Sequence, residues 1–191
     1  MSDPERTGAS HSQVEWQRWS LDTQDPQWYS LTMKRKVYIE SSVVSYYTGR
    51  PSRDVVIAGR QQSTQDFWPL LSRELLPHVS ALVVKEAGNG DPEMARKRLD
   101  AIHSFSVLAT TPDSERLAAE ILASHGIPEE YPEDALHVAI AAIAGMEFIV
   151  TWNFSHINNP FTKMMIRQAV ENAGYECPEI VPPDAFLGDE P

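Results

Sequence analysis

Short apolar runs alternate with longer segments of helical periodicity from residue 36 onward. Strand-like runs begin at KVYI (36–39), PHVS (77–80), SFSVLATT (104–111), MEFIVTW (146–152) and PEIV (178–181). Helical spacing of apolar residues covers 53–74, 92–102, 112–126, 132–145 and 159–174, and a short helix follows PHVS. Strands separated by helices predict right-handed crossovers and a mainly parallel sheet covered on both faces. The fold class predicted is α/β, with three α/β/α layers.

Proline and glycine indicate where these helices begin, bend and end. Pro69 predicts a kink in the segment 53–74. The glycines at 88 and 90 end the short helix after PHVS. Pro112 and Gly126 bound the helix at 112–126, whose first turn carries acidic residues. The helix at 132–145 is apolar on nearly every face, so we expect it to be buried.

The first 32 residues differ from the rest because they lack sustained periodicity and are rich in polar residues and proline. We expect a polar N-terminal extension at 1–32 that is disordered or that docks locally through Trp16, Trp19 and Trp28. One domain is predicted at 33–187, followed by a tail at 188–191. Met33, followed by KRKVYIE, would also serve as a natural start of translation.

Composition and charge exclude several classes of protein. The formal net charge is −11, the wrong sign for a broad surface that wraps nucleic acid. A polyanionic substrate would therefore need a local basic patch or a bound cation. The longest apolar run, ALHVAIAAIAGM, is too short to span a membrane, and the opening residues do not form a signal peptide. The single cysteine, Cys177, allows no internal disulfide, so we expect a cytoplasmic protein.

Four polar residues border apolar runs and are the candidates for chemistry. They are Glu40 after VYI, Glu86 near ALVV, Asp134 before ALHVAIAAI, and Asn153 after FIVTW. In parallel sheets, ligand sites lie beyond the carboxyl ends of the strands, where Glu40 and Asn153 are predicted to be. Carboxylate and amide oxygens suit hard cations such as Mg²⁺ or Mn²⁺.

Each candidate also has an ordinary structural explanation. Asp134 and its neighbour Glu133 could simply complement the dipole of their helix, and a lone Glu such as Glu86 is usually solvated. Asn153 after a strand is a common turn residue. Glu40 is the hardest to explain in this way, because a buried strand end offers little water.

Taken together, these segments resemble the PIN-domain nucleases, in particular the VapC-like toxins of type II toxin–antitoxin pairs. The resemblance covers about residues 35–186. It rests on VYIESSVVSYYTGRPSRD, LVVKEAGNGDPEMARKRL and PEDALHVAIAAIAGMEFIVTWNFSHI, and on the order of elements between them. It implies a compact PIN-like α/β/α domain whose acidic cluster holds Mg²⁺ or Mn²⁺ and cleaves RNA.

The resemblance also implies roles for individual residues. The acidic positions of the family fall on Glu40, Glu86 and Asp134, which would be the metal ligands, and its fourth position falls on Asn153. The small hydroxyl residue two places after the first acid falls on Ser42, and Ser42 and Asn153 would position water or phosphate. The chain departs from the family at two places: the first acid is usually Asp, and the fourth position is often Asp.

Clustering of the three carboxylates would have an electrostatic consequence. Two carboxylates about 4 Å apart repel by roughly 4 kcal/mol at an effective dielectric constant near 20. A cation, or a proton on one of the carboxyl groups, relieves such repulsion. A bound cation would also explain how an acidic protein contacts RNA.

Basic, aromatic and histidine residues give weaker signals. Candidate contacts to an RNA backbone are Arg50, Arg53, Arg60, Lys163 and Arg167, although basic residues on amphipathic helices are more often solvated. Tyr46 and Tyr47 could stack on bases, but core packing is the commoner use. We expect structural roles for His137 and His156.

Three functional hypotheses follow from the sequence. The first is a metal-dependent endoribonuclease that acts as a toxin and is restrained by a cognate antitoxin. The second is a non-catalytic PIN-like module that binds RNA or protein. The third is a metal-dependent phosphatase, although the chain lacks the two closely spaced aspartates of one large class of such enzymes. Whether the chain forms a homodimer is left open, and no membrane partner is expected.

Overall fold

The computed structural model describes residues 34–188. The predicted extension at 1–32, with its tryptophans, lies outside the described residues, as does almost all of the predicted tail.

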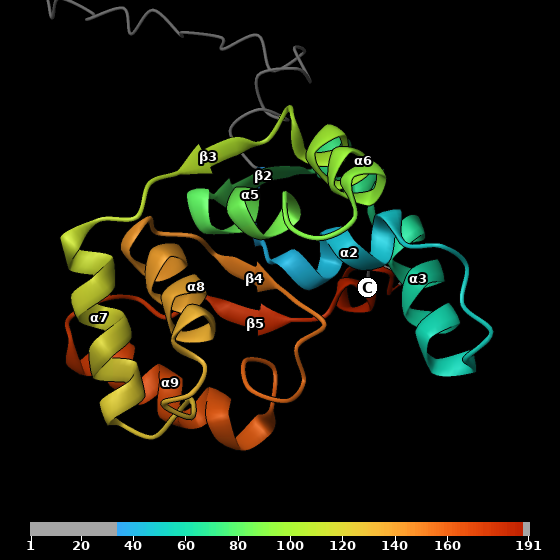
Figure 1. The fold of residues 1–191 in the computed structure, drawn as a ribbon. Helices are drawn as coiled ribbons and strands as arrows, with labels where there is room; N and C mark the ends of the chain where they lie inside the picture. The colour runs from blue at the N-terminus through green and yellow to red at the C-terminus, as the bar shows by residue number, and fades with distance from the viewer. Residues whose placement is uncertain (1–33, 189–191) are drawn as a thin grey trace, which may run out of the picture. The chain divides into compact units, whose positions relative to one another are not determined.

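A parallel sheet forms the centre of the described domain (Figure 1). Its strands are β1 (Arg35–Ile39), β2 (Leu75–Ser80), β3 (Ser106–Leu108), β4 (Phe148–Val150) and β5 (Glu179–Val181). Their order is β3-β2-β1-β4-β5, and every bonded pair is parallel. The register places Tyr38 of β1 between His78 of β2 and Ile149 of β4. The predicted α/β class with a parallel sheet is therefore confirmed.

The helices occupy the segments between the strands. They are α2 (Ser41–Thr48), α3 (Val55–Phe67), α4 (Leu70–Arg73), α5 (Ala81–Ala87), α6 (Pro92–Ile102), α7 (Pro112–Ala123), α8 (Pro132–Ile143) and α9 (Pro160–Asn172), with a 3₁₀ helix, η1 (Pro183–Phe186), after β5. The predicted kink at Pro69 is confirmed, since it lies between α3 and α4. Helix α2 was not predicted from the pattern. None of the helices in residues 34–188 is long and apolar enough to cross a bilayer.

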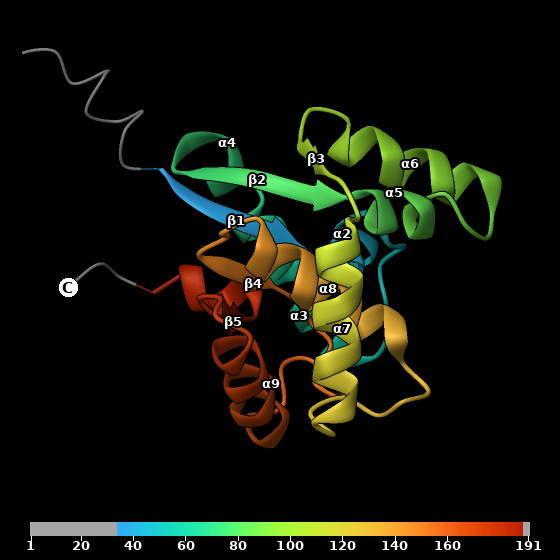
Figure 2. The ribbon, with the colours of Figure 1, turned by 90° about the vertical axis from the view of Figure 1, so that its left-hand side faces the viewer.

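The helices form two groups on opposite faces of the sheet. Helix α2 contacts α3, α5 and α6, whereas α7 contacts α8 and α9. Figures 1 and 2 both show α7, α8 and α9 grouped together. The chain moves from β1 outward to β3 and then returns to β4, so right-handed crossovers place the two groups on different faces. The switch point, where parallel sheets bind ligands, lies between the carboxyl ends of β1 and β4.

Strand β1 runs through the middle of the core. Its last three residues, Val37, Tyr38 and Ile39, are fully buried because helices cover both faces of the sheet. Burial of such side chains stabilises a fold by about 1.5–3 kcal/mol each. The strand is therefore a rigid support for whatever follows its end.

Candidate metal centre

Glu40 follows β1 directly and begins helix α2. Its backbone is extended, with φ −79° and ψ 156°, and its side chain accepts a hydrogen bond from the backbone N–H of Ser42 as the N-cap. The bond from Ser42 N to Glu40 Oε1 measures 3.1 Å. Only 5% of the residue is exposed, so its charge needs partners. The N-cap hydrogen bond therefore explains in part why an acidic residue is buried at this strand end.

The second oxygen of Glu40 ties β1 to β4 across the switch point. Oε2 accepts hydrogen bonds from Ser42 Oγ and, at 2.7 Å, from Thr151 Oγ1. Ser42 Oγ in turn accepts from the backbone N–H of Trp152 at 2.9 Å. Ser42 therefore orients the Glu40 carboxylate, and the role that the resemblance implies for it, positioning water or phosphate, stays a prediction.

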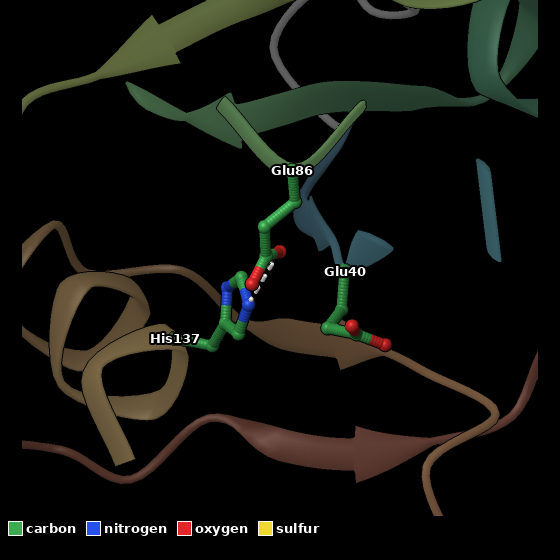
Figure 3. Close-up of side chains that lie close together, drawn as sticks. All are labelled: Glu40, Glu86 and His137. Carbon is green, nitrogen blue, oxygen red and sulfur yellow. Dashed lines mark hydrogen bonds and ion pairs between the residues drawn. The ribbon is translucent and has the colours of Figure 1, made fainter. Parts of the chain in front are cut away.

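Glu86 and His137 lie beside Glu40 (Figure 3). One oxygen from each carboxylate and one ring nitrogen of His137 all lie within 4.8 Å of one another. Glu86, near the end of α5, points toward His137 of α8, and His137 Nε2 lies 3.1 Å from Glu86 Oε2. The fold thus brings together three groups that are far apart in the sequence.

The ionisation of this cluster follows from its contacts. Burial alone would lower the pKa of His137, but its hydrogen bond to Glu86 and the nearby charges of Glu40, Glu86 and Asp134 outweigh it and raise that pKa. Burial would raise the pKa of Glu86, but its hydrogen bond and charge interaction with His137 dominate and lower it. Both directions favour an imidazolium paired with a carboxylate.

Behind His137, Tyr38 fixes the orientation of the imidazole ring. The Tyr38 hydroxyl lies 2.7 Å from His137 Nδ1 and 2.7 Å from Ser80 Oγ. Burial raises the pKa of Tyr38 far above its usual range, so the phenol stays protonated. His137 therefore has a partner on each nitrogen, and its contact with Glu86 is fixed by the core.

Asp134 lies on the first turn of α8 and faces a different partner. Its Oδ2 is 2.8 Å from His156 Nδ1, a contact that spans 22 positions in the sequence. The residue at the N-cap of α8, Tyr131, makes no side-chain cap, so the acids at the start of this helix also complement its dipole. Asp134 and Glu86 nevertheless line one pocket of about 290 Å³.

The side chain of Asn153 stabilises the turn after β4. Its Oδ1 accepts a hydrogen bond from the backbone N–H of His156 at 3.0 Å, and the backbone N–H of Asn153 donates to Thr151 Oγ1 at 2.9 Å. Within residues 34–188, Asn153 therefore makes the contacts of an ordinary turn residue.

The predicted site residues are thus brought together in part. Glu40 and Glu86 form one cluster, Ser42 holds Glu40, and Asp134 shares a pocket with Glu86. The sequence did not indicate that His137 joins the cluster or that Thr151 binds Glu40. One available signal was the position of His137 three residues after Asp134, because this spacing places both residues on one face of a helix.

The carboxylate oxygens of Glu40 and Glu86 suit a hard divalent cation. A carboxylate offers about four acceptor positions, and three of those on Glu40 are used, which leaves one on Oε1. Both side-chain hydrogen-bond contacts of the Glu86 carboxylate involve Oε2. Within the described residues, Oε1 therefore accepts no hydrogen bond. Carboxylate oxygens suit Mg²⁺ and Mn²⁺. The unused acceptor positions of Glu40 and Glu86 are therefore available to one cation.

Comparisons with known proteins give similarity to solved structures only. No family model and no curated protein matches the sequence. The chain is similar to VapBC2 of Rickettsia felis bound to a promoter DNA fragment, with a TM-score of 0.48 and 16% identity over 66% of this chain and 94% of that one. It is also similar to VapC20 of Mycobacterium tuberculosis, a sarcin–ricin loop cleaving toxin, with a TM-score of 0.49 and 17% identity over 65% and 95%.

A third similar structure is a tyrosyl-tRNA synthetase from Archaeoglobus fulgidus complexed with L-tyrosine. The TM-score is 0.42 and the identity 12%, over 78% of this chain and 55% of that one.

Proposed function

We propose that the protein is a metal-dependent ribonuclease that hydrolyses RNA phosphodiester bonds. The observation that carries this proposal is the pair of carboxylates, Glu40 and Glu86, at the switch point of the sheet, with unused acceptor positions on both. A buried carboxylate beside a second one is costly unless a positive group compensates it. His137 relieves the charge of Glu86, and a divalent cation would compensate the remaining negative charge and also support hydrolysis.

Different residues would bind the cation and position its ligands. Glu40 and Glu86 hold the cation, and Asp134 is the third ligand that the sequence resemblance implies, on the wall of the same pocket as Glu86. When bound, Mg²⁺ or Mn²⁺ would polarise a phosphodiester and lower the pKa of water. Ser42 and Thr151 keep the Glu40 carboxylate in one orientation, and His137 does the same for Glu86.

The substrate and the biological role come from the sequence resemblance. RNA as substrate, the role of toxin and a cognate antitoxin as partner are all part of the proposal. The net charge of −11 supports the need for a cation where an anionic strand approaches the cluster.

Incubation of the protein with a labelled mixture of RNAs tests the proposed activity. We expect cleavage in Mg²⁺ or Mn²⁺ and none in EDTA, because the carboxylates alone do not attract a phosphodiester. A matched incubation with single-stranded DNA shows whether the substrate is RNA in particular. Absence of RNA cleavage in both metals, at protein concentrations that bind RNA, would contradict the proposal.

A non-catalytic binding module is the second candidate. Two contacts favour it: Asp134 is paired with His156, and the Asn153 amide oxygen is used within its own turn. RNA binding without cleavage in either metal would be the result that supports this alternative.

A further inference from the structure

Arg60 of α3 lies among three aromatic rings close to the candidate metal centre. The carbon at the centre of its guanidinium group is 5.1 Å from the ring centroid of Phe154, 5.6 Å from that of Trp152 and 6.0 Å from that of Tyr46. These distances are in the range of cation–π contacts. We call Arg60, Tyr46, Trp152 and Phe154 the arginine box.

The arginine box is fixed by hydrogen bonds to its neighbours. The Trp152 indole N–H donates to Thr64 Oγ1 at 2.8 Å, and Thr64 lies one turn after Arg60 on α3. Arg60 Nη1 donates to the Tyr46 hydroxyl at 3.2 Å. Trp152 is 6% exposed, whereas Phe154 is 40% exposed. The guanidinium therefore lies on a rigid base, with one ring of the box open to solvent.

The charge of Arg60 has no carboxylate partner within the described residues. Other arginines do have one: Arg35 pairs with Glu147, and Arg116 pairs with Asp113. The side chain of Arg60 offers five N–H donors, and the Tyr46 hydroxyl uses one of them. A half-buried cation with unused planar donors matches the geometry of a phosphate.

The arginine box is directly connected to the acidic cluster. The backbone N–H of Trp152 donates to Ser42 Oγ, which itself donates to the Glu40 carboxylate. Thr151, the residue before Trp152, also donates to Glu40. Tyr46 belongs to α2, the helix that Glu40 caps. The arginine box and the acidic cluster therefore share one support, the residues Thr151 and Trp152 that follow β4.

We propose that the arginine box is a subsite for single-stranded RNA, in which Arg60 binds a phosphate beside the cleaved bond and Phe154 stacks on an unpaired base. This inference rests on the proposed function, because the subsite is placed relative to that centre. Aromatic rings combined with arginine are typical of surfaces that bind single strands. An acidic peptide could satisfy the charge of Arg60, but it would offer no flat face to the exposed ring of Phe154.

Binding of a fluorescein-labelled single-stranded RNA, measured by anisotropy in EDTA, tests the subsite without any cleavage. We expect Arg60→Gln to weaken binding by about tenfold or more, as for a lost charge-assisted contact. The slope of log K against log salt should fall by about 0.7, the value for one phosphate contact on a single strand. Phe154→Leu should weaken binding by about fivefold or more and reduce the preference for single strands over a duplex of the same sequence.

Arg73→Gln is the matched control, because it makes the same change of charge at a different place. Arg73 ends α4, before the amino end of β2, and pairs with Glu74. This variant should bind RNA as the wild type does. Arg60→Lys keeps the charge and replaces Arg60→Gln if that variant does not fold. The salt slope should then persist while affinity falls, because lysine lacks the planar fork.

The subsite would be overturned if the wild type binds no RNA, or if the wild type, the Arg60 variants and Phe154→Leu all bind equally. It would also be overturned if Arg60→Gln loses no more affinity than Arg73→Gln. Competition by an acidic peptide with no effect of Phe154→Leu would assign the box to a protein partner instead. If RNA binding depends on Arg60 but no metal supports cleavage, the subsite stands and the nuclease proposal fails. If cleavage is unchanged in Arg60→Gln, including its KM, the nuclease stands and the subsite fails.

Discussion

Glu86→Gln is expected to lose metal-dependent RNA cleavage by about 10²- to 10⁴-fold, since a bound metal contributes several kcal/mol to the transition state. Gln keeps the size of the side chain and can still accept a hydrogen bond from His137. It removes the negative charge and leaves only a weak neutral oxygen for a cation. The measurement is the initial rate of cleavage of a labelled RNA at saturating Mn²⁺.

The control for this prediction is Glu93→Gln, which makes the same change on α6, where Glu93 is exposed and pairs with Lys97. Its rate should equal that of the wild type. Circular dichroism of both variants establishes that they are folded. A Glu86→Gln rate within threefold of the wild-type rate would remove Glu86 from the proposed centre.

Phe67→Ala should lower the free energy of unfolding by about 3–5 kcal/mol, the usual range for truncating a buried aromatic ring. Phe67 ends α3 and is fully buried, and its ring centroid lies 5.2 Å from that of Phe186 in η1. Truncation leaves a cavity where α3 packs against η1. This loss is a large part of the roughly 5–15 kcal/mol that stabilises a domain. Urea denaturation, followed by fluorescence, measures the change.

Phe161→Ala provides the comparison, because Phe161 of α9 is 78% exposed. Its free energy of unfolding should change by no more than about 0.5 kcal/mol. Equal denaturation midpoints for Phe67→Ala and the wild type would contradict the packing of α3 against η1.

The order of strands and helices could be predicted because it depends on local patterns. Runs such as FIV and helices such as 92–102 carry their periodicity in a few consecutive residues, and Pro69 breaks a helix wherever it lies. Helix α2 was missed for a physical reason. Its sequence SSVVSYYT is rich in β-branched and aromatic residues, which favour strands, and its start is set by the cap that Glu40 provides.

The candidate site could be predicted only in part, because side-chain partners depend on which faces meet in the fold. Glu40 was indicated by its position after a buried strand. The contact of Asp134 with His156 depends on how the start of α8 lies against the turn after β4, and the position of His137 depends on Glu86 of α5 and Tyr38 of β1. The periodicity of the sequence indicates only that Asp134 and His137 share one face of a helix.

Charge compensation in the acidic cluster involves more groups than the sequence indicated. From the sequence, repulsion among carboxylates was expected to be relieved by a cation or by protonation of a carboxyl group. Contact with His137 is a further form of relief, because it lowers the pKa of Glu86 while the pKa of His137 is raised. The buried Glu40 carboxylate is held instead by hydroxyl and backbone N–H donors.

Titration of the protein with Mn²⁺ by isothermal calorimetry tests most directly whether Glu40 and Glu86 form a metal centre. We expect saturable binding to the wild-type protein. Binding to Glu86→Gln should be at least about tenfold weaker, since loss of even a supporting contact of a metal ligand costs about that much. Binding of equal strength in the variant, or no saturable binding to the folded wild type, would contradict a metal centre at Glu40 and Glu86.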